Sequence, residues 1–279
     1  MRMLVLLFSL ALGTTALAAS ADLAPATRAF DDGAFPRAAF LARKLDTSQG
    51  DAFAARAELV QGEFVSVGAA RRAAFDRALA DARRALLRDP ARPEGHLYLA
   101  VALGLVARGE GVLMAHVAGY GDEARAHIDR ALVLAPDNAW AHAALGGWHL
   151  EIAYAGGLVG AALYGASVEA GEASYERALV LDPGNTSIAW QYALQLTGIG
   201  GKSRIDRAQA LLAAILEHPP QTALDRFLRD GATELAAAVE SRNRPQMLRV
   251  VTRRLGRDGF GATAPGPRIE TRPGVGRTR

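Results

Sequence analysis

Histidines are the side chains of this chain best suited to chemistry, and His142 and His149 stand in one short segment. Imidazole binds zinc and exchanges protons near neutral pH, so such a pair is first considered as a metal site. In a helix, however, a spacing of seven residues separates the two rings by roughly 10 Å along the axis, too far to share one ion. No His-Glu-x-x-His sequence accompanies them. We therefore predict no metal site and expect packed, hydrogen-bonded imidazoles.

Motifs for nucleophilic catalysis and phosphate binding are also missing. The sequence has no Gly-x-Ser-x-Gly elbow and no cysteine, which excludes thiol catalysis, disulfides and thiolate ligands. The glycine-rich stretches 104–111 and 156–165 lack the Gly-Lys-Ser/Thr ending of a phosphate loop. The sequence thus predicts no catalytic residues and no cofactor, and the chain is not expected to be an enzyme.

The N-terminus predicts export. Arg2 precedes an apolar run from Leu4 to Leu12, and small residues suited to signal peptidase follow. The run is shorter than the about 20 residues that span a bilayer. Residues 1–21 are therefore predicted to be a cleaved signal peptide, which makes the mature protein periplasmic or secreted. The alternative is an uncleaved segment that anchors the protein to the inner membrane.

Charge is unevenly distributed along the chain. Residues 93–201 carry 4 basic and 11 acidic groups, whereas residues 202–279 carry 15 basic and 8 acidic groups. No lysine or arginine occurs from Ala131 to Glu176. An acidic middle beside a basic end argues against nucleic acid as a partner along the whole chain.

An internal repeat indicates which elements hold these residues. Small residues recur at offsets 0 and 7 and a proline recurs at offset 12 in the segments 78–90, 124–136 and 171–183, with a weaker copy at 207–219. Offsets 0, 4 and 7 share one helical face, and small side chains there let two helices approach closely. The proline ends each helix. Each segment resembles the second helix of a tetratricopeptide repeat (TPR), and Leu145-Gly146 with Trp148 resembles its first helix.

The predicted fold is all-α, a TPR-like α-solenoid of antiparallel helix pairs with inter-helix insertions, over residues 22–256. Repeat cores are expected at about 71–90, 93–136, 138–183 and 185–219. Earlier helices are expected at 23–32, 35–45 and 51–64, and short capping helices at 223–229, 233–241 and 246–255. The closing prolines are farther apart than the usual repeat length, and the extra residues, 109–121 and 156–170, would loop out between paired helices. Residues 257–279 are predicted to be a disordered basic tail.

A narrower resemblance covers residues 75–217. The sequences Leu145-Gly-Gly-Trp148, Tyr164-Gly-Ala-Ser167 and Tyr175-Glu-Arg-Ala178 resemble the TPR domain of the regulator of microtubule dynamics family. The resemblance implies a TPR bundle, and it associates members on organelle membranes with membrane contact and lipid handling. Residues 152–168 depart from the family pattern because they are uncharged and glycine-rich, where the family usually carries basic and aromatic residues.

In a TPR array the binding site is expected on the concave face. The repeat register places there the candidate groove residues Leu97, Val101, Trp140, Ala143, Gly147, Leu150, Trp190 and Leu194. An apolar groove favours a hydrophobic peptide, a lipid or an acyl chain. The alternative is that the array is closed and that the two tryptophans belong to its core.

Two functions follow from this pattern. The first is an exported scaffold for protein–protein interaction in a bacterial cell envelope, with a protein or peptide as partner. The alternative is a module that binds a lipid or acyl chain in the apolar groove. The uncharged segment 152–168 is too rich in glycine to span a membrane, and we expect it to cover the groove or to touch a membrane surface.

Overall fold

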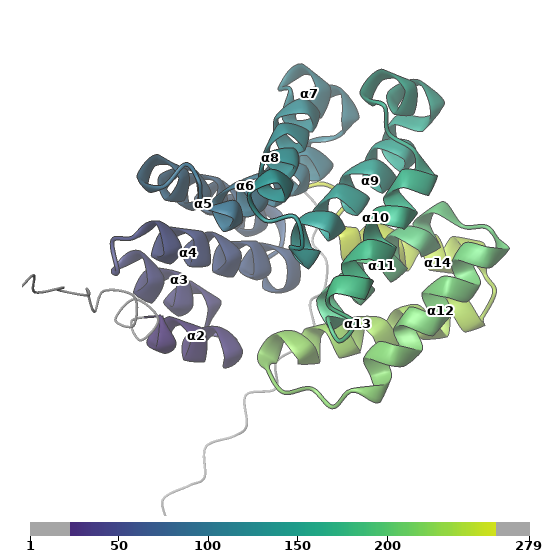
Figure 1. Ribbon diagram of the computed structural model, residues 1–279. Coiled ribbons are helices and arrows are strands. Elements are labelled where there is room, and N and C mark those ends of the chain that lie inside the picture. The colour runs from purple at the N-terminus through teal and green to yellow at the C-terminus, as the bar shows by residue number, and fades with distance from the viewer. Residues whose placement is uncertain (1–22, 261–279) are drawn as a thin grey trace, which may run out of the picture.

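The computed structural model describes residues 23–260, so the predicted signal peptide and positions 261–279 of the predicted tail lie outside the described residues. Within the described range every regular element is helical, which confirms the all-α prediction (Figure 1). The helices are α2 (Ala24–Asp31), α3 (Phe35–Arg43), α4 (Ser48–Val60) with a π-helical turn (Gln61–Val65), α5 (Gly68–Arg88), α6 (Pro93–Glu110), α7 (Val112–Val117), α8 (Tyr120–Leu134), α9 (Ala139–Tyr164), α10 (Val168–Leu181), α11 (Thr186–Ile199), α12 (Lys202–Glu217), α13 (Ala223–Glu240) and α14 (Arg244–Leu255).

Most of these helices form antiparallel pairs that stack side by side, as in a TPR array. The pairs are α2 with α3, α4 with α5, α6 with α8, α9 with α10, α11 with α12, and α13 with α14. Each pair also packs on the next pair along the chain. Because a pair buries its apolar face only against its neighbours, the stack as a whole forms the core.

The small residues of the repeat lie where two helices meet. Ala85, Ala131 and Ala178 occupy equivalent positions in α5, α8 and α10, and all three are fully buried. Each of these helices ends shortly before its closing proline, which cannot continue a helix. The recurring alanine and proline therefore set the packing and the length of the second helix in each repeat.

The first helices of two successive repeats, α9 and α11, begin with an asparagine side-chain cap. The Asn138 side chain accepts hydrogen bonds from the backbone N–H groups of Trp140 and Ala141 at the start of α9. Asn185 accepts one from Ile188 at the start of α11. Such caps satisfy N–H groups that have no partner inside the helix. Equivalent asparagines thus fix where two successive repeats begin.

The array closes on itself. The Phe227 ring of α13 lies 6.5 Å from the Phe35 ring of α3 and 6.3 Å from the Phe64 ring, measured between centroids. A Cβ atom added at Gly33 would stand 2.7 Å from the Ala223 side chain, so the two backbones approach closely there. The first and last helices consequently share one hydrophobic core with α9 to α12.

Ion pairs join α3, α4 and α5 within the closed array. The carboxylates of Asp51, Glu58 and Asp81 are almost completely buried. Arg43 of α3 donates to Glu58 at 2.6 Å and to Asp81 at 2.7 Å, and Arg88 donates to Asp51 at 2.8 Å. Buried carboxylates are tolerated when they are paired in this way.

Two parts of the sequence-based description differ from the structure. The segments 223–229 and 233–241 belong to one continuous helix, α13. Gly231 lies inside this helix, at the point where Trp190 packs against it. A Cβ atom at Gly231 would stand 2.8 Å from the Trp190 ring. The insertions at 109–121 and 156–170 are largely helical: the first forms α7 and the second extends α9.

Candidate functional site

The histidines mainly serve the packing of the repeats. The Nε2–H group of His96 donates to the Pro90 carbonyl at 2.9 Å, and that of His142 donates to the Pro136 carbonyl at 2.8 Å. Both residues therefore join the start of a first helix to the closing proline of the preceding repeat. These contacts explain two of the histidines without a ligand.

His96 also contacts His127 of α8, with their Nδ1 atoms 2.8 Å apart. Because Nε2 of His96 already donates to a carbonyl, its Nδ1 accepts and His127 donates. Burial, together with the charge of neighbouring groups, lowers the pKa of His127, which favours the neutral ring that this contact needs. Within residues 23–260 no three His, Asp or Glu side chains are grouped so that they could hold a metal ion.

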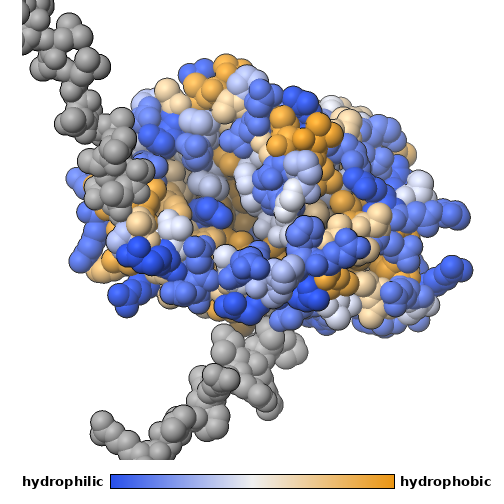
Figure 2. Space-filling view, turned by 60° about the horizontal axis from the view of Figure 1, so that its bottom comes forward, coloured by the Kyte–Doolittle hydropathy of each residue, from blue (hydrophilic) through white to orange (hydrophobic). Residues whose placement is uncertain are grey.

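The predicted groove residues are mostly inside the array. Trp140 is the most accessible, with 40% of its surface exposed, and Val101 and Gly147 are partly buried. Five others are buried: Leu97, Ala143, Leu150, Trp190 and Leu194. Figure 2 shows a hollow in one face of the molecule, with mostly hydrophilic residues around it. The groove itself stays a prediction.

The last described residues pack against α6 and α9. Arg257 donates to Glu151 at 2.8 Å, and Phe260 packs so closely on Gly109 that a Cβ atom there would collide with its ring. These two residues fall in the predicted disordered tail, yet the structure places them against α6 and α9. Burial alone would raise the pKa of Glu151, but Arg108 and Arg257 outweigh it and lower that pKa.

Two shallow depressions, of about 420 and 330 Å³, lie along α14. None of the eight predicted groove residues lines either of them. The first is bordered mainly by α14 itself, and the second lies between α14, the middle of α9, the start of α10 and the end of α11. Both depressions are open to solvent, whereas sites for small ligands usually enclose most of the ligand surface.

The largest group of exposed apolar side chains lies on the two insertions. Leu113 and Val117 of α7 are 74% and 72% exposed, and Leu158 and Val159 of α9 are 91% and 81% exposed. Val112, Met114 and Leu163 are exposed as well. We call residues 112–117 and 158–164 together the apolar tip. Both parts stand at the same end of the molecule, at the top of Figure 1.

The apolar tip and its supports are uncharged over long stretches. Neither residues 111–121 nor residues 152–168 contain Asp, Glu, Lys or Arg. The nearest charges, Glu110, Asp122, Glu151 and Glu169, stand at the roots of the two insertions. Among the described helices, none is both long and apolar enough to cross a membrane.

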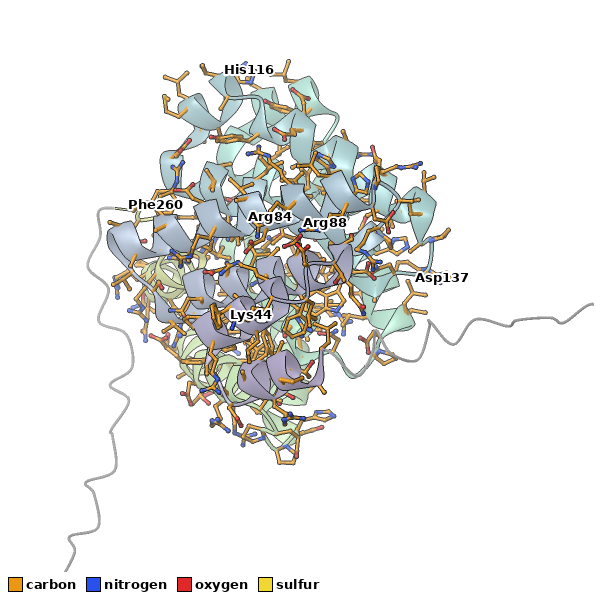
Figure 3. The ribbon with its side chains drawn as sticks, turned by 90° about the vertical axis from the view of Figure 1, so that its left-hand side faces the viewer. Lys44, Arg84, Arg88, His116, Asp137 and Phe260 are labelled. Atoms are coloured by element: carbon orange, nitrogen blue, oxygen red, sulfur yellow. The ribbon has the colours of Figure 1, made fainter. Side chains whose placement is uncertain are left out.

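Contacts between the insertions hold the tip together. His116 Nδ1 lies 2.7 Å from the Tyr164 hydroxyl, with the rings edge to face. Tyr164 also meets the edge of Trp148, whose indole N–H donates to the Gly121 carbonyl at 2.8 Å. The two insertions are therefore joined both at the tip and at their roots. Figure 3 shows His116 at the extreme top of the molecule.

A break in α9 directs its last turns. The backbone leaves helical geometry at Gly157, where φ is 57° and ψ is −155°, and then returns to a helix up to Tyr164. A positive φ at this position suits glycine because a Cβ atom would strain the backbone. Gly157 thus turns the second part of α9 so that Leu158 and Val159 face solvent.

The apolar tip could be found only in part from the sequence. The uncharged segment 152–168 is visible as such, and a membrane contact is expected of it. Membrane contact was not expected of residues 112–117, because a six-residue apolar stretch usually belongs to the hydrophobic core of a repeat protein. Only the pairing of α6 with α8 brings α7 beside the end of α9.

Comparison with protein families matches residues 53–240 to the family described as Regulator of microtubule dynamics protein 1-3. A search among curated proteins found none that matches the chain. The family match covers the repeats and both insertions, and it agrees with the resemblance seen in the sequence.

The fold also resembles a solved structure. The crystal structure of a thermophilic TPR protein of Thermus thermophilus superposes with a TM-score of 0.54 at 22% sequence identity. The match covers 77% of this chain and 96% of the Thermus chain. At this identity the likeness confirms the TPR-like fold and carries no inference about a ligand.

Proposed function

The chain belongs to the family of the regulator of microtubule dynamics proteins 1–3, and we propose that it is a non-enzymatic scaffold that binds another protein. We propose further that it is exported to a bacterial cell envelope, which the signal-peptide pattern of residues 1–21 supports. The TPR-like fold supports a protein as partner, because arrays of this kind present extended surfaces to polypeptides. Proteins of one fold can have different functions, so binding of a partner requires a specific surface on this molecule.

That surface is a row of apolar side chains at equivalent positions of three repeats. Leu87, Val133 and Val180 each stand three residues before a closing proline, and they are 82%, 69% and 69% exposed. Single exposed aliphatic residues are common on proteins and need no explanation. Here, however, every one of the three clear repeats presents one at the same place. We call these three residues the repeat row.

The repeat row is suited to a polypeptide partner. Its members come from α5, α8 and α10, one from each of three successive pairs, so they follow the direction in which the repeats stack. Charged residues stand beside them, among them Arg88 and the ion pair of Arg177 with Asp137 at 3.0 Å. Apolar contacts surrounded by charged groups are typical of transient protein interfaces.

Site-specific photocrosslinking tests the scaffold function. A photoreactive residue is introduced at position 87, 133 or 180, and crosslinking is done in the living host. We expect all three positions to capture the same protein, and expect the triple substitution Leu87→Asp, Val133→Asp and Val180→Asp to abolish its binding. Phe40, an exposed apolar residue of α3, is the matched control position. Different proteins at the three positions, or none, would overturn the proposal.

Export is tested separately. Fusion of alkaline phosphatase after residue 21 gives an enzyme that becomes active only outside the cytoplasm. We expect activity from this fusion and none when Leu4 to Leu12 are deleted. Sequencing the N-terminus of the protein from the host distinguishes the cleaved form from an anchored one that still begins at Met1.

A further inference from the structure

We infer that the apolar tip docks the protein onto a lipid membrane, with the aliphatic side chains of α7 and the end of α9 dipping into the layer. This surface is separate from the repeat row, and the inference does not depend on a protein partner. Three observations carry it: the composition of the tip, its shape, and the place where the described chain ends.

The composition of the tip fits lipid better than protein. Its only polar side chains are His116 and Tyr164, and these satisfy each other across 2.7 Å. A protein interface of ordinary size carries a polar rim and about one hydrogen bond per 100–200 Å². The tip offers no free charge or polar side chain for such contacts, whereas a lipid layer requires none.

The shape of the tip favours insertion into a lipid layer, which can deform around a projecting surface. The two insertions end side by side and project from one end of the molecule (Figure 1). Most of the tip is helical, so part of its backbone is hydrogen-bonded internally, as groups that enter a membrane must be. Charges at the roots, Glu110 and Asp122 among them, would stop the tip at a shallow depth. Tyr164 and Tyr154 are of the type that lies at the boundary between lipid and water.

The described chain ends beside α6, near the root of the first insertion (Figure 3). Phe260 packs on Gly109, which lies two residues before Gly111 at the root of α7. The 19 residues that follow include Arg268, Arg272, Arg277 and Arg279, with Glu270 as the only acidic residue. A segment of this length can reach roughly 60 Å when extended. An apolar insertion combined with a basic segment is a pairing that binds anionic membranes stably.

Fluorescent probes at single cysteines test the contact directly. The sequence has no cysteine, so Leu113→Cys, Leu158→Cys and Leu87→Cys each attach one environment-sensitive nitrobenzoxadiazole group to the full chain. With vesicles of phosphatidylcholine and phosphatidylglycerol, we expect the emission at positions 113 and 158 to rise severalfold and to shift to the blue. The probe at Leu87, on the repeat row, should not respond. Because each probe reports its own position, binding by residues 1–21 does not mimic the result.

A second set of variants tests which side chains drive docking. Leu158→Asp with Val159→Asp should reduce the vesicle response at position 113 by at least roughly tenfold, because charge opposes entry into lipid. Both side chains are almost fully exposed, so the fold should persist. The matched control, Leu87→Asp with Val180→Asp, should leave the vesicle response unchanged.

Three outcomes would overturn the inference. One is the absence of a response at positions 113 and 158, and another is an equal response at position 87. The third is a response that grows with protein concentration when no vesicles are present, since that would mean a second copy covers the tip. Replacing the mixed vesicles by phosphatidylcholine alone isolates the basic segment: we expect weaker binding with the same blue shift. Crosslinking at the repeat row does not involve the tip, so either proposal can fail alone.

Discussion

The Phe227 ring lies 6.5 Å from the Phe35 ring, which brings the second helix of the described chain against the second-last. Contacts of this kind join the two ends of the array through one core. Because of these contacts, a substitution at one end of the array is expected to affect the stability of both ends.

Phe227→Ala should destabilise the whole molecule rather than one end. Phe227 is partly buried, so we expect a loss of about 2–3 kcal/mol in the free energy of unfolding, below the full value for a core phenylalanine. Denaturant titration measures it, and hydrogen exchange should rise in both α2 and α13. Phe40→Ala, at an exposed phenylalanine of α3, is the control and should cost less than about 1 kcal/mol. Equal losses in both variants would contradict the closed array.

Glycines at the crossing of α9 with α10 should not tolerate a methyl group. A Cβ atom at Gly146 would stand 2.5 Å from the Tyr175 ring, and one at Gly171 would stand 2.6 Å from Leu150. We expect Gly146→Ala and Gly171→Ala each to cost about 1–3 kcal/mol, because the helices must move apart. Thermal unfolding checks this.

Gly104 of α6 provides the opposite case. A Cβ atom there would meet no atom within 4 Å apart from its neighbours in the same helix. Gly104→Ala should therefore stabilise the protein by about 0.5–1 kcal/mol, since alanine is the better helix former. If all three alanine variants behaved alike, close packing at Gly146 and Gly171 would not be the cause.

Acidification should weaken the fold through His149. Its buried ring accepts a hydrogen bond from the Ser167 backbone N–H at 3.3 Å, and burial followed by the charge of Arg125 lowers its pKa below the usual 6.5. The unfolded chain then takes up a proton before the folded one does, so stability is full above about pH 6.5 and falls as the pH drops towards the lowered value. Denaturant titrations between about pH 7.5 and about pH 5 measure this slope.

His149→Asn isolates that contribution. The asparagine carbonyl oxygen can accept the Ser167 N–H without titrating. We expect a smaller decrease in stability on acidification than in the unchanged protein, with the remainder including His127, whose pKa is also lowered. An unaltered slope would show that His149 does not cause the decrease.

Arg257→Ala should release the last described residues from the interior. Arg257 donates to Glu151 and lies 3.8 Å from the centre of the Tyr154 ring. Removing it leaves Glu151 with Arg108 alone, which should cost about 1–3 kcal/mol and expose the segment near Phe260 to protease. Limited proteolysis read by mass spectrometry detects the change. Arg249→Ala, at an exposed arginine of α14, should leave the cleavage pattern as it was.

The repeats could be predicted from the sequence because their rule is local. An alanine seven residues after a small residue, and a proline five residues later, determine one helix and its end without reference to the rest of the chain. Ala85, Ala131 and Ala178 are accordingly fully buried, and α5, α8 and α10 end as expected. The family resemblance rests on the same local patterns.

Closure of the array and the apolar tip could not be predicted in this way. Both join segments far apart in the sequence: Phe35 with Phe227, and His116 with Tyr164. The periodicity of each helix indicates which face is buried but not which distant helix buries it. For this reason Trp190 could be placed on the inner side of its repeat, while its contact with Gly231 of α13 could not be foreseen.

Because the first and last helix pairs contact each other, the number of repeats in the array is fixed. Duplication of one repeat would carry α2 away from α13 and break the Phe35–Phe227 contact, whereas an open solenoid accepts extra units at little cost. Additional residues can be inserted without breaking this contact at the turns between the two helices of a pair. Both insertions occupy such turns. The molecule can therefore accept longer insertions more easily than additional repeats.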